Sequence, residues 1–167
     1  MIRILQTGGR WVFVRIEAAF TAVFGEHWNP WFQLGALSFY FFWVIVATGI
    51  YLFVFFNTSI IGAFESVERL SNVQWYFGGV MRSLHRYASD AMAITVTLHL
   101  VREFALGRFR GAQWFSWVSG VPLLWLLFAS AIGGYWLVWD QFAQYIAILS
   151  TEWLERLPNI SDSLART

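Results

Sequence analysis

Two histidines on one long stretch are the residues whose type and spacing are most informative about chemistry. His85 and His99 lie fourteen residues apart within residues 78–104. On one continuous α-helix, fourteen residues rise about 21 Å, and fourteen steps of about 100° end some 40° short of four full turns. Both imidazoles therefore project from nearly the same face, one toward each side of a hydrocarbon core about 30 Å thick. Neutral imidazole is a good metal ligand, so this spacing predicts two metal centres, one above the other.

Arginines accompany each histidine. Arg82 and Arg86 flank His85 at −3 and +1, and Arg102 follows His99 at +3. Charged side chains are costly in lipid, so this helix should face the inside of a helix bundle and bind a ligand there. Arginine pairs well with the propionates of haem. The joint pattern favours two haems, one in each leaflet. The alternative is that the histidines only pack between helices and the arginines extend to the membrane surface.

Glycines repeat the same spacing on the two neighbouring apolar stretches. Gly35 and Gly49 are fourteen residues apart, and so are Gly120 and Gly134. Small residues let helices approach closely, or let a flat macrocycle lie against a helix. The middle helix runs antiparallel to the other two. Gly49 and Gly134 should therefore lie at the depth of the first histidine, and Gly35 and Gly120 at the depth of the second.

The composition excludes several classes of protein. Hydrophobic residues make up 58% of the chain and aromatic residues 20%, which is more apolar surface than a soluble domain of 167 residues could bury. A formal net charge of +1, without a basic run, argues against a nucleic-acid partner. Because there is no Cys, the chain can form no disulfide, no thiolate metal site and no thioether-attached haem.

The chain divides into an interfacial amphipathic segment, a membrane domain and a surface tail. The predicted fold is an all-α membrane protein. It has three transmembrane helices of a haem-binding four-helix bundle, with amphipathic surface helices at the N-terminus and C-terminus. The predicted boundaries are 1–30 for the segment, 31–140 for the membrane domain with helices about 33–56, 78–104 and 114–139, and 141–167 for the tail, with a break at Pro158 and Asn159.

Arginine placement predicts the orientation. Three arginines in the N-terminal arm and Arg108 and Arg110 between the second and third helices fall on one side. The positive-inside rule assigns that side to the cytoplasm. We therefore expect an integral protein of a bacterial inner membrane, or an equivalent energy-transducing membrane, with a cytoplasmic N-terminus. That N-terminus has no features of a cleaved signal. His27, alone at the interface, is expected to be a polar surface residue.

The sequence resembles the N-terminal half of cytochrome b, as found in cytochrome bc1 and, more closely, b6f complexes. The resemblance covers about residues 29–158. The matching segments are AFESV in the first loop, GGVMRSLHRYAS and LHLVREF in the second helix, WVSGV at the start of the third and GYWLVWDQ at its end.

The resemblance implies that His85 ligates the haem nearer the outer face and His99 the haem nearer the inner face. It also implies propionate contacts from the three arginines flanking these histidines, and a quinol-oxidation pocket near Trp139, Asp140 and Gln141. Its partners would be further redox subunits of the Rieske, c-type cytochrome or iron–sulfur kind.

The chain departs from the family pattern in three respects. Val138 stands where the family usually has Pro, and Gln33 stands where b6-type proteins have the Cys that holds an extra haem. The family binds its haems between its second and fourth helices, whereas three predicted helices are found here. The fourth helix and a second histidine pair are expected from another polypeptide or further sequence. Pairing of His85 with the same residue of a second copy is the alternative.

The predicted function is a dihaem b-type cytochrome subunit, with non-covalent haems, that carries electrons across the membrane in a quinol-linked complex. It is an electron-transfer part of an oxidoreductase and is not expected to complete a catalytic site alone. One alternative is a haem-bearing anchor that links the quinone pool to a peripheral dehydrogenase or reductase. Others are a proton or ion carrier using His85, Asp90 and His99, and an assembly subunit without a cofactor.

Overall fold

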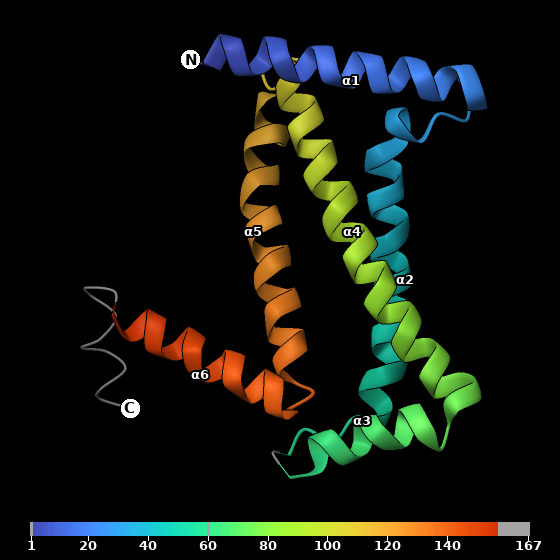
Figure 1. Ribbon diagram of the computed structural model, residues 1–167, viewed down its shortest axis with the longest axis vertical. Helices are drawn as coiled ribbons and strands as arrows, with labels where there is room; N and C mark the ends of the chain where they lie inside the picture. Colours follow the sequence, from blue (N-terminus) through green and yellow to red (C-terminus); the bar gives the residue numbers. More distant parts are fainter. Residues whose placement is uncertain (1, 60, 157–167) are drawn as a thin grey trace.

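The computed structural model describes residues 2–59 and 61–156, and every regular element in these ranges is helical (Figure 1). This confirms the predicted all-α class. The α-helices are α1 (Ile2–Phe24), α2 (Leu34–Phe55), α3 (Gly62–Asn72), α4 (Val80–Ala105), α5 (Trp114–Trp136) and α6 (Gln141–Glu155). Short 3-10 turns cover Pro30–Gln33 and Gly111–Gln113, and a π-helical turn covers Trp75–Gly79 just before α4.

Helices α2, α4 and α5 stand side by side, with α4 antiparallel to the other two (Figure 1). Helix α4 packs most extensively on α2, where the Ser38 hydroxyl hydrogen-bonds the Thr95 hydroxyl at 3.1 Å. Helices α4 and α5 meet near α1, where the Trp117 indole N–H donates to the Leu100 carbonyl at 3.2 Å. From there they diverge, leaving a space that α2 borders as well.

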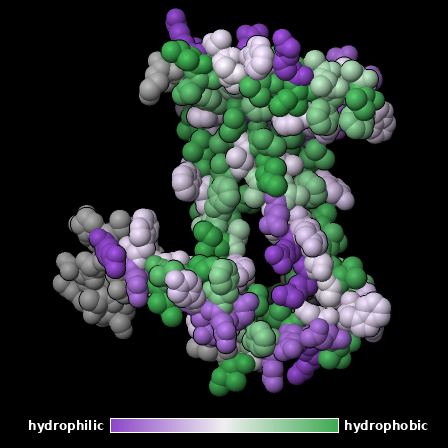
Figure 2. All heavy atoms as spheres, in the orientation of Figure 1, coloured by the Kyte–Doolittle hydropathy of each residue, from purple (hydrophilic) through white to green (hydrophobic). Residues whose placement is uncertain are grey.

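Two stretches of helix within the described residues are long and apolar enough to cross a membrane by length and composition alone. They are Pro30–Phe55 and Gly111–Trp136, which contain α2 and α5. Their large side chains, such as Phe39, Trp43 and Trp125, are mostly exposed, and Figure 2 shows apolar surface over the body of the molecule. Exposed apolar surface on this scale marks contact with lipid or with other protein.

Helix α1 lies crosswise over the ends of α4 and α5 (Figure 1). At the crossing Gly9 faces Ala105: a Cβ added to the glycine would lie 3.0 Å from the alanine Cβ. The Gln6 amide donates to the Phe104 carbonyl at 3.3 Å. Beyond α1, the fully buried Asn29 uses its amide nitrogen to donate to the Glu17 carbonyl at 2.9 Å. These contacts fix α1 against the end of the bundle.

Several boundaries differ from those expected. Within the predicted segment 1–30, helix α1 runs unbroken from Ile2 to Phe24, and α5 ends at Trp136, three residues before the predicted end at residue 139. Trp139 has a positive φ of 54°, and the Asp140 carboxylate accepts from the Ala143 N–H at 2.6 Å. The carboxylate thus caps the start of α6, directly after the turn that leads out of α5. The break predicted at residues 158 and 159 lies outside the described residues.

Candidate cofactor-binding site

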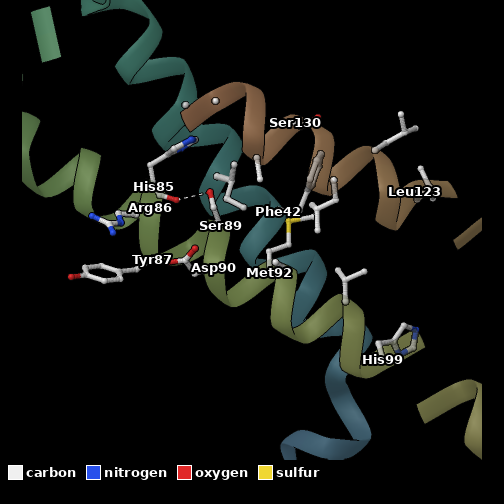
Figure 3. Close-up of a pocket in the computed structure, with 18 of the residues that line it drawn as sticks. Phe42, His85, Arg86, Tyr87, Ser89, Asp90, Met92, His99, Leu123 and Ser130 are labelled. Carbon is white, nitrogen blue, oxygen red and sulfur yellow. Dashed lines mark hydrogen bonds between the residues drawn. The ribbon is translucent and has the colours of Figure 1, made fainter. Parts of the chain in front are cut away.

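A cavity of about 1740 Å³ opens between α2, α4 and α5. It exceeds the range of about 300–1,000 Å³ that is usual for small-molecule pockets, so it has room for more than one such ligand. Figure 3 shows part of its lining. The predicted ligand, arginine and glycine residues that line it are His85, His99, Arg82, Arg86, Arg102, Gly35, Gly49, Gly120 and Gly134.

His85 is held on one side by α2. Its Nδ1 lies 2.9 Å from the Thr48 hydroxyl oxygen, and that hydroxyl donates its own hydrogen to the Val44 carbonyl at 2.7 Å. With the hydroxyl hydrogen on Val44, the oxygen can accept from Nδ1–H, and in that tautomer Nε2 carries no proton and can act as a ligand. A Cβ added to Gly49 would lie 3.2 Å from His85 Cε1. The glycine thus leaves the space that the imidazole occupies.

His99 has the corresponding glycine at the other end of α2. A Cβ added to Gly35 would lie 3.3 Å from His99 Cε1 and 3.5 Å from its Nε2. His85 and His99 both project from the cavity side of α4, at separate levels along the helix (Figure 3). The structure thus brings each histidine together with one glycine of α2, in the antiparallel order that the shared spacing predicts.

The glycines of α5 border the cavity differently. A Cβ on Gly120 would lie 3.3 Å from Cδ1 of Leu100, the residue that follows His99 in the sequence. A Cβ on Gly134 would meet nothing within 4 Å. Open space in front of Gly134 leaves a smooth helix surface on the cavity side. A flat ligand can approach that surface closely.

Two arginines lie at the His85 level. Arg82 donates from Nη1 to the Ser71 hydroxyl at 2.8 Å, and Arg86 is exposed. Asp90 lies one turn beyond Arg86 along α4 and also lines the cavity (Figure 3). Within the described ranges neither Arg86 nor Asp90 forms an ion pair. Both charges therefore remain available to a ligand or a partner.

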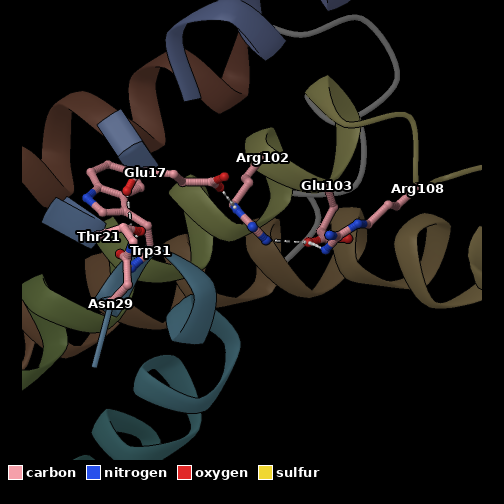
Figure 4. A network of polar contacts seen from close by, with 7 residues as sticks. All are labelled: Glu17, Thr21, Asn29, Trp31, Arg102, Glu103 and Arg108. Atoms are coloured by element: carbon pink, nitrogen blue, oxygen red, sulfur yellow. Dashed lines mark hydrogen bonds and ion pairs between the residues drawn. The ribbon is translucent and has the colours of Figure 1, made fainter. Parts of the chain in front are cut away.

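Arg102, at the His99 level, belongs to a network of charges (Figure 4). Its Nε donates to Glu17 of α1 at 2.6 Å, and its Nη1 donates to Glu103 at 3.2 Å. The same oxygen of Glu103 accepts from Arg108 at 3.1 Å. The Arg102 guanidinium also lies over the Phe32 ring, 5.8 Å from its centroid. Among the residues that the structure describes, this arginine therefore differs from Arg82 and Arg86 in having carboxylate partners.

The three residues predicted to border a quinone pocket do not act as one group. Asp140 lines the large cavity, whereas Trp139 and Gln141 do not. The Asp140 carboxylate caps α6, and the Trp139 carbonyl accepts from the Gln144 amide at 3.0 Å. All three lie at the turn between α5 and α6.

Sequence reasoning missed three residues that shape the site: Thr48, Glu17 and Asn29. Thr48 directly precedes one of the repeated glycines, so its nearness to His85 could have been inferred from that spacing. No local signal pairs Glu17 with Arg102, because 85 positions separate them in the sequence.

The residues present fit non-covalent haem. Two imidazoles face one large, mostly apolar cavity, and the glycines of α2 leave room for both rings. Imidazole is a common axial ligand of haem iron, and nearby arginines suit the propionates. No residue of the chain is a Cys, so a thioether link to this chain is excluded.

Comparison with known proteins agrees with this chemistry. The family Cytochrome b/b6/petB matches residues 20–167. Cytochrome b6 of Heliomicrobium gestii is 33% identical over 136 residues, covering 81% of this chain and 63% of the relative. Cytochrome b6 of Cyanidium caldarium is 30% identical over 138 residues, with 83% and 64% covered. That of Euglena gracilis is 31% identical over 136 residues, with 81% and 63% covered.

The chain thus spans less than two thirds of the length of these relatives. The predicted family is nevertheless confirmed, because the match extends over most of the chain and includes α4 with both histidines. The chain therefore belongs to the cytochrome b/b6 family, whose members are haem-binding integral membrane proteins of electron transport.

Proposed function

We propose that this chain is a dihaem b-type cytochrome subunit that carries electrons across the membrane in a quinol-linked, bc1/b6f-like complex. The observation that carries the proposal is the cavity, which is lined at two separate levels by His85 and His99, each backed by a glycine of α2. His85 would hold the haem nearer the outer face and His99 the haem nearer the inner face. When bound, haem supplies one-electron redox chemistry at each level.

Helix α4 would be the third transmembrane helix. Its 26 residues give a length of about 39 Å, which is more than the hydrocarbon core of about 30 Å requires. Most of its charges lie in its first and last turns, and they face the cavity or α1. That arrangement shields them from lipid. The arginine count then supports a cytoplasmic position for α1 and the N-terminus, in a bacterial inner or equivalent energy-transducing membrane.

The remaining axial ligands would come from outside these three helices. Two six-coordinate haems need four axial ligands, and α4 supplies two histidines. His27, which is exposed near the end of α1, cannot serve both levels. We therefore propose a fourth helix with a second histidine pair at similar spacing, on a separate chain or on further sequence. A Rieske-type protein and a c-type cytochrome, or another iron–sulfur protein, would complete the electron path.

A quinol pocket would lie at the turn between α5 and α6, near Trp139, Asp140 and Gln141. The same turn supports a second candidate function, a haem-bearing anchor that passes electrons between the quinone pool and a peripheral dehydrogenase or reductase. In favour of the anchor, the Asp140 carboxylate already caps α6, and the Trp139 carbonyl already accepts a hydrogen bond from the Gln144 amide. Both residues therefore have roles within the chain that need no quinol.

Optical and magnetic spectra of the complex isolated in mild detergent test the proposal. We expect two haems for each copy of this chain, a sharp reduced α-band, and low-spin signals typical of two nitrogen ligands. One haem per chain, or a high-spin signal from the undamaged complex, would contradict bis-histidine ligation at both levels. Quinol-dependent reduction of a c-type partner separates the quinol-oxidising complex from the anchor, because only the complex supports it.

A further inference from the structure

The inner end of the cavity contains a buried cation that has carboxylate partners within this chain. The Arg102 side chain is only 6% exposed. Its Nε lies 2.6 Å from the Glu17 carboxylate and its Nη1 lies 3.2 Å from Glu103, whose oxygen also accepts from Arg108. A buried guanidinium needs such partners, because an unpaired buried charge is strongly destabilising. Two carboxylates and two arginines together give this network a formal charge of zero.

Glu17 is distinct within this network because it comes from α1, the helix that crosses the end of the bundle (Figure 4). Its main chain is fixed independently of its carboxylate: the Asn29 amide donates to the Glu17 carbonyl at 2.9 Å and to the Thr21 hydroxyl at 2.8 Å. The contact between Gly9 and Ala105 holds α1 at the same end of α4. The carboxylate is thus presented to Arg102 by an already fixed backbone.

We propose that Glu17 is a positioning residue for Arg102 and thereby sets the charge at the inner end of the cavity. The proposal rests on the proposed function, since the haem at His99 is the group that would sense this charge. Glu17 holds the guanidinium toward α1 and offsets its charge. Without Glu17, the guanidinium would be less restrained and less neutralised. Added positive charge favours the reduced state of a nearby redox centre, since reduction removes one positive charge from it.

The test uses the complete complex and an optical redox titration that resolves both haems. The variant Glu17→Gln keeps the side chain's shape and the main-chain bond from Asn29. We expect a higher midpoint potential for the His99 haem, with no change at the His85 haem or in haem content. The matched control is Glu26→Gln, because Glu26 is exposed just beyond α1 and forms no ion pair within the described ranges. It should leave both potentials unchanged.

A second background separates positioning from a direct effect of the Glu17 charge. If Glu17 acts mainly through Arg102, the shift caused by Glu17→Gln should be clearly smaller when Arg102→Gln is already present. The charge-preserving variant Glu17→Asp should stay closer to the parent protein than Glu17→Gln does, and it provides a folded variant should Glu17→Gln fail to assemble. These two results would support the proposal.

Four results would overturn it. They are an unchanged potential in Glu17→Gln, an equal shift at both haems, an equal shift in Glu26→Gln, and a shift that is just as large in the Arg102→Gln background. Absence of any haem at the His99 level would overturn the proposed function as well. A haem that is present there but insensitive to Glu17 would overturn this inference alone, so the two failures are distinguishable.

Discussion

Adding one methyl group at Gly49 tests whether the glycines of α2 make room for the histidines. In Gly49→Ala the new Cβ would lie 3.2 Å from His85 Cε1. Carbon atoms in good contact are about 3.5–4.0 Å apart, so the imidazole or the helix must move by about 0.3–0.8 Å. Overpacking of this kind costs about 1–3 kcal/mol. If that cost falls on ligand binding, the affinity for haem at the His85 level weakens by about 5-fold to 150-fold.

The measurement is the haem content and the resolved α-band of the purified complex. Gly49→Ala should weaken the His85 haem, and Gly35→Ala, whose Cβ would lie 3.3 Å from His99 Cε1, should weaken the His99 haem. The control is Gly133→Ala, because a Cβ there meets nothing within 4 Å. It should keep both haems and gain up to about 1 kcal/mol of helix stability. Equal haem loss from all three substitutions, or none from any, would refute the steric reasoning.

Two further predictions concern neighbouring contacts. Thr48→Val removes the hydroxyl that hydrogen-bonds His85 Nδ1, and loss of such an outer contact should weaken haem binding at that level by about 10-fold to 100-fold in a haem titration. Thr97→Val removes a hydroxyl that bonds within its own helix and should not weaken it; equal effects would contradict the orienting role. Gly9→Ala should loosen α1, because its Cβ would lie 3.0 Å from the Ala105 Cβ, and should speed proteolysis of α1 in detergent. Gly8→Ala, with nothing within 4 Å, should not, and equal cleavage of both variants would contradict the crossing.

The sequence alone indicates the long helices and which glycine of α2 lies beside which histidine of α4, because both follow from periodic spacing. A separation of fourteen residues on α2 and α4 brings Gly49 to His85 and Gly35 to His99 once the helices are antiparallel. Apolar length likewise marks α2 and α5. These features depend on the helix repeat, which is the same in every α-helix.

Other features depend on tertiary packing and could not be predicted in this way. The partner of Arg102 is Glu17, because α1 crosses the end of α4 at a point that no local pattern specifies. The resemblance assigned this arginine to a propionate, and its pairing with two carboxylates was not foreseen. Helix α5 also ends at Trp136, before the predicted residue 139. An apolar run continues past this point, so composition alone gave no sign of the turn.

The most direct test of the central claim is an optical redox titration of the complex with each histidine replaced in turn. We expect two low-spin components in the parent protein. His99→Leu should remove one component and leave the other at its original wavelength, and His85→Leu should remove the other one. Retention of both components in either variant, or loss of the same component in both, would contradict ligation of two haems by these two histidines.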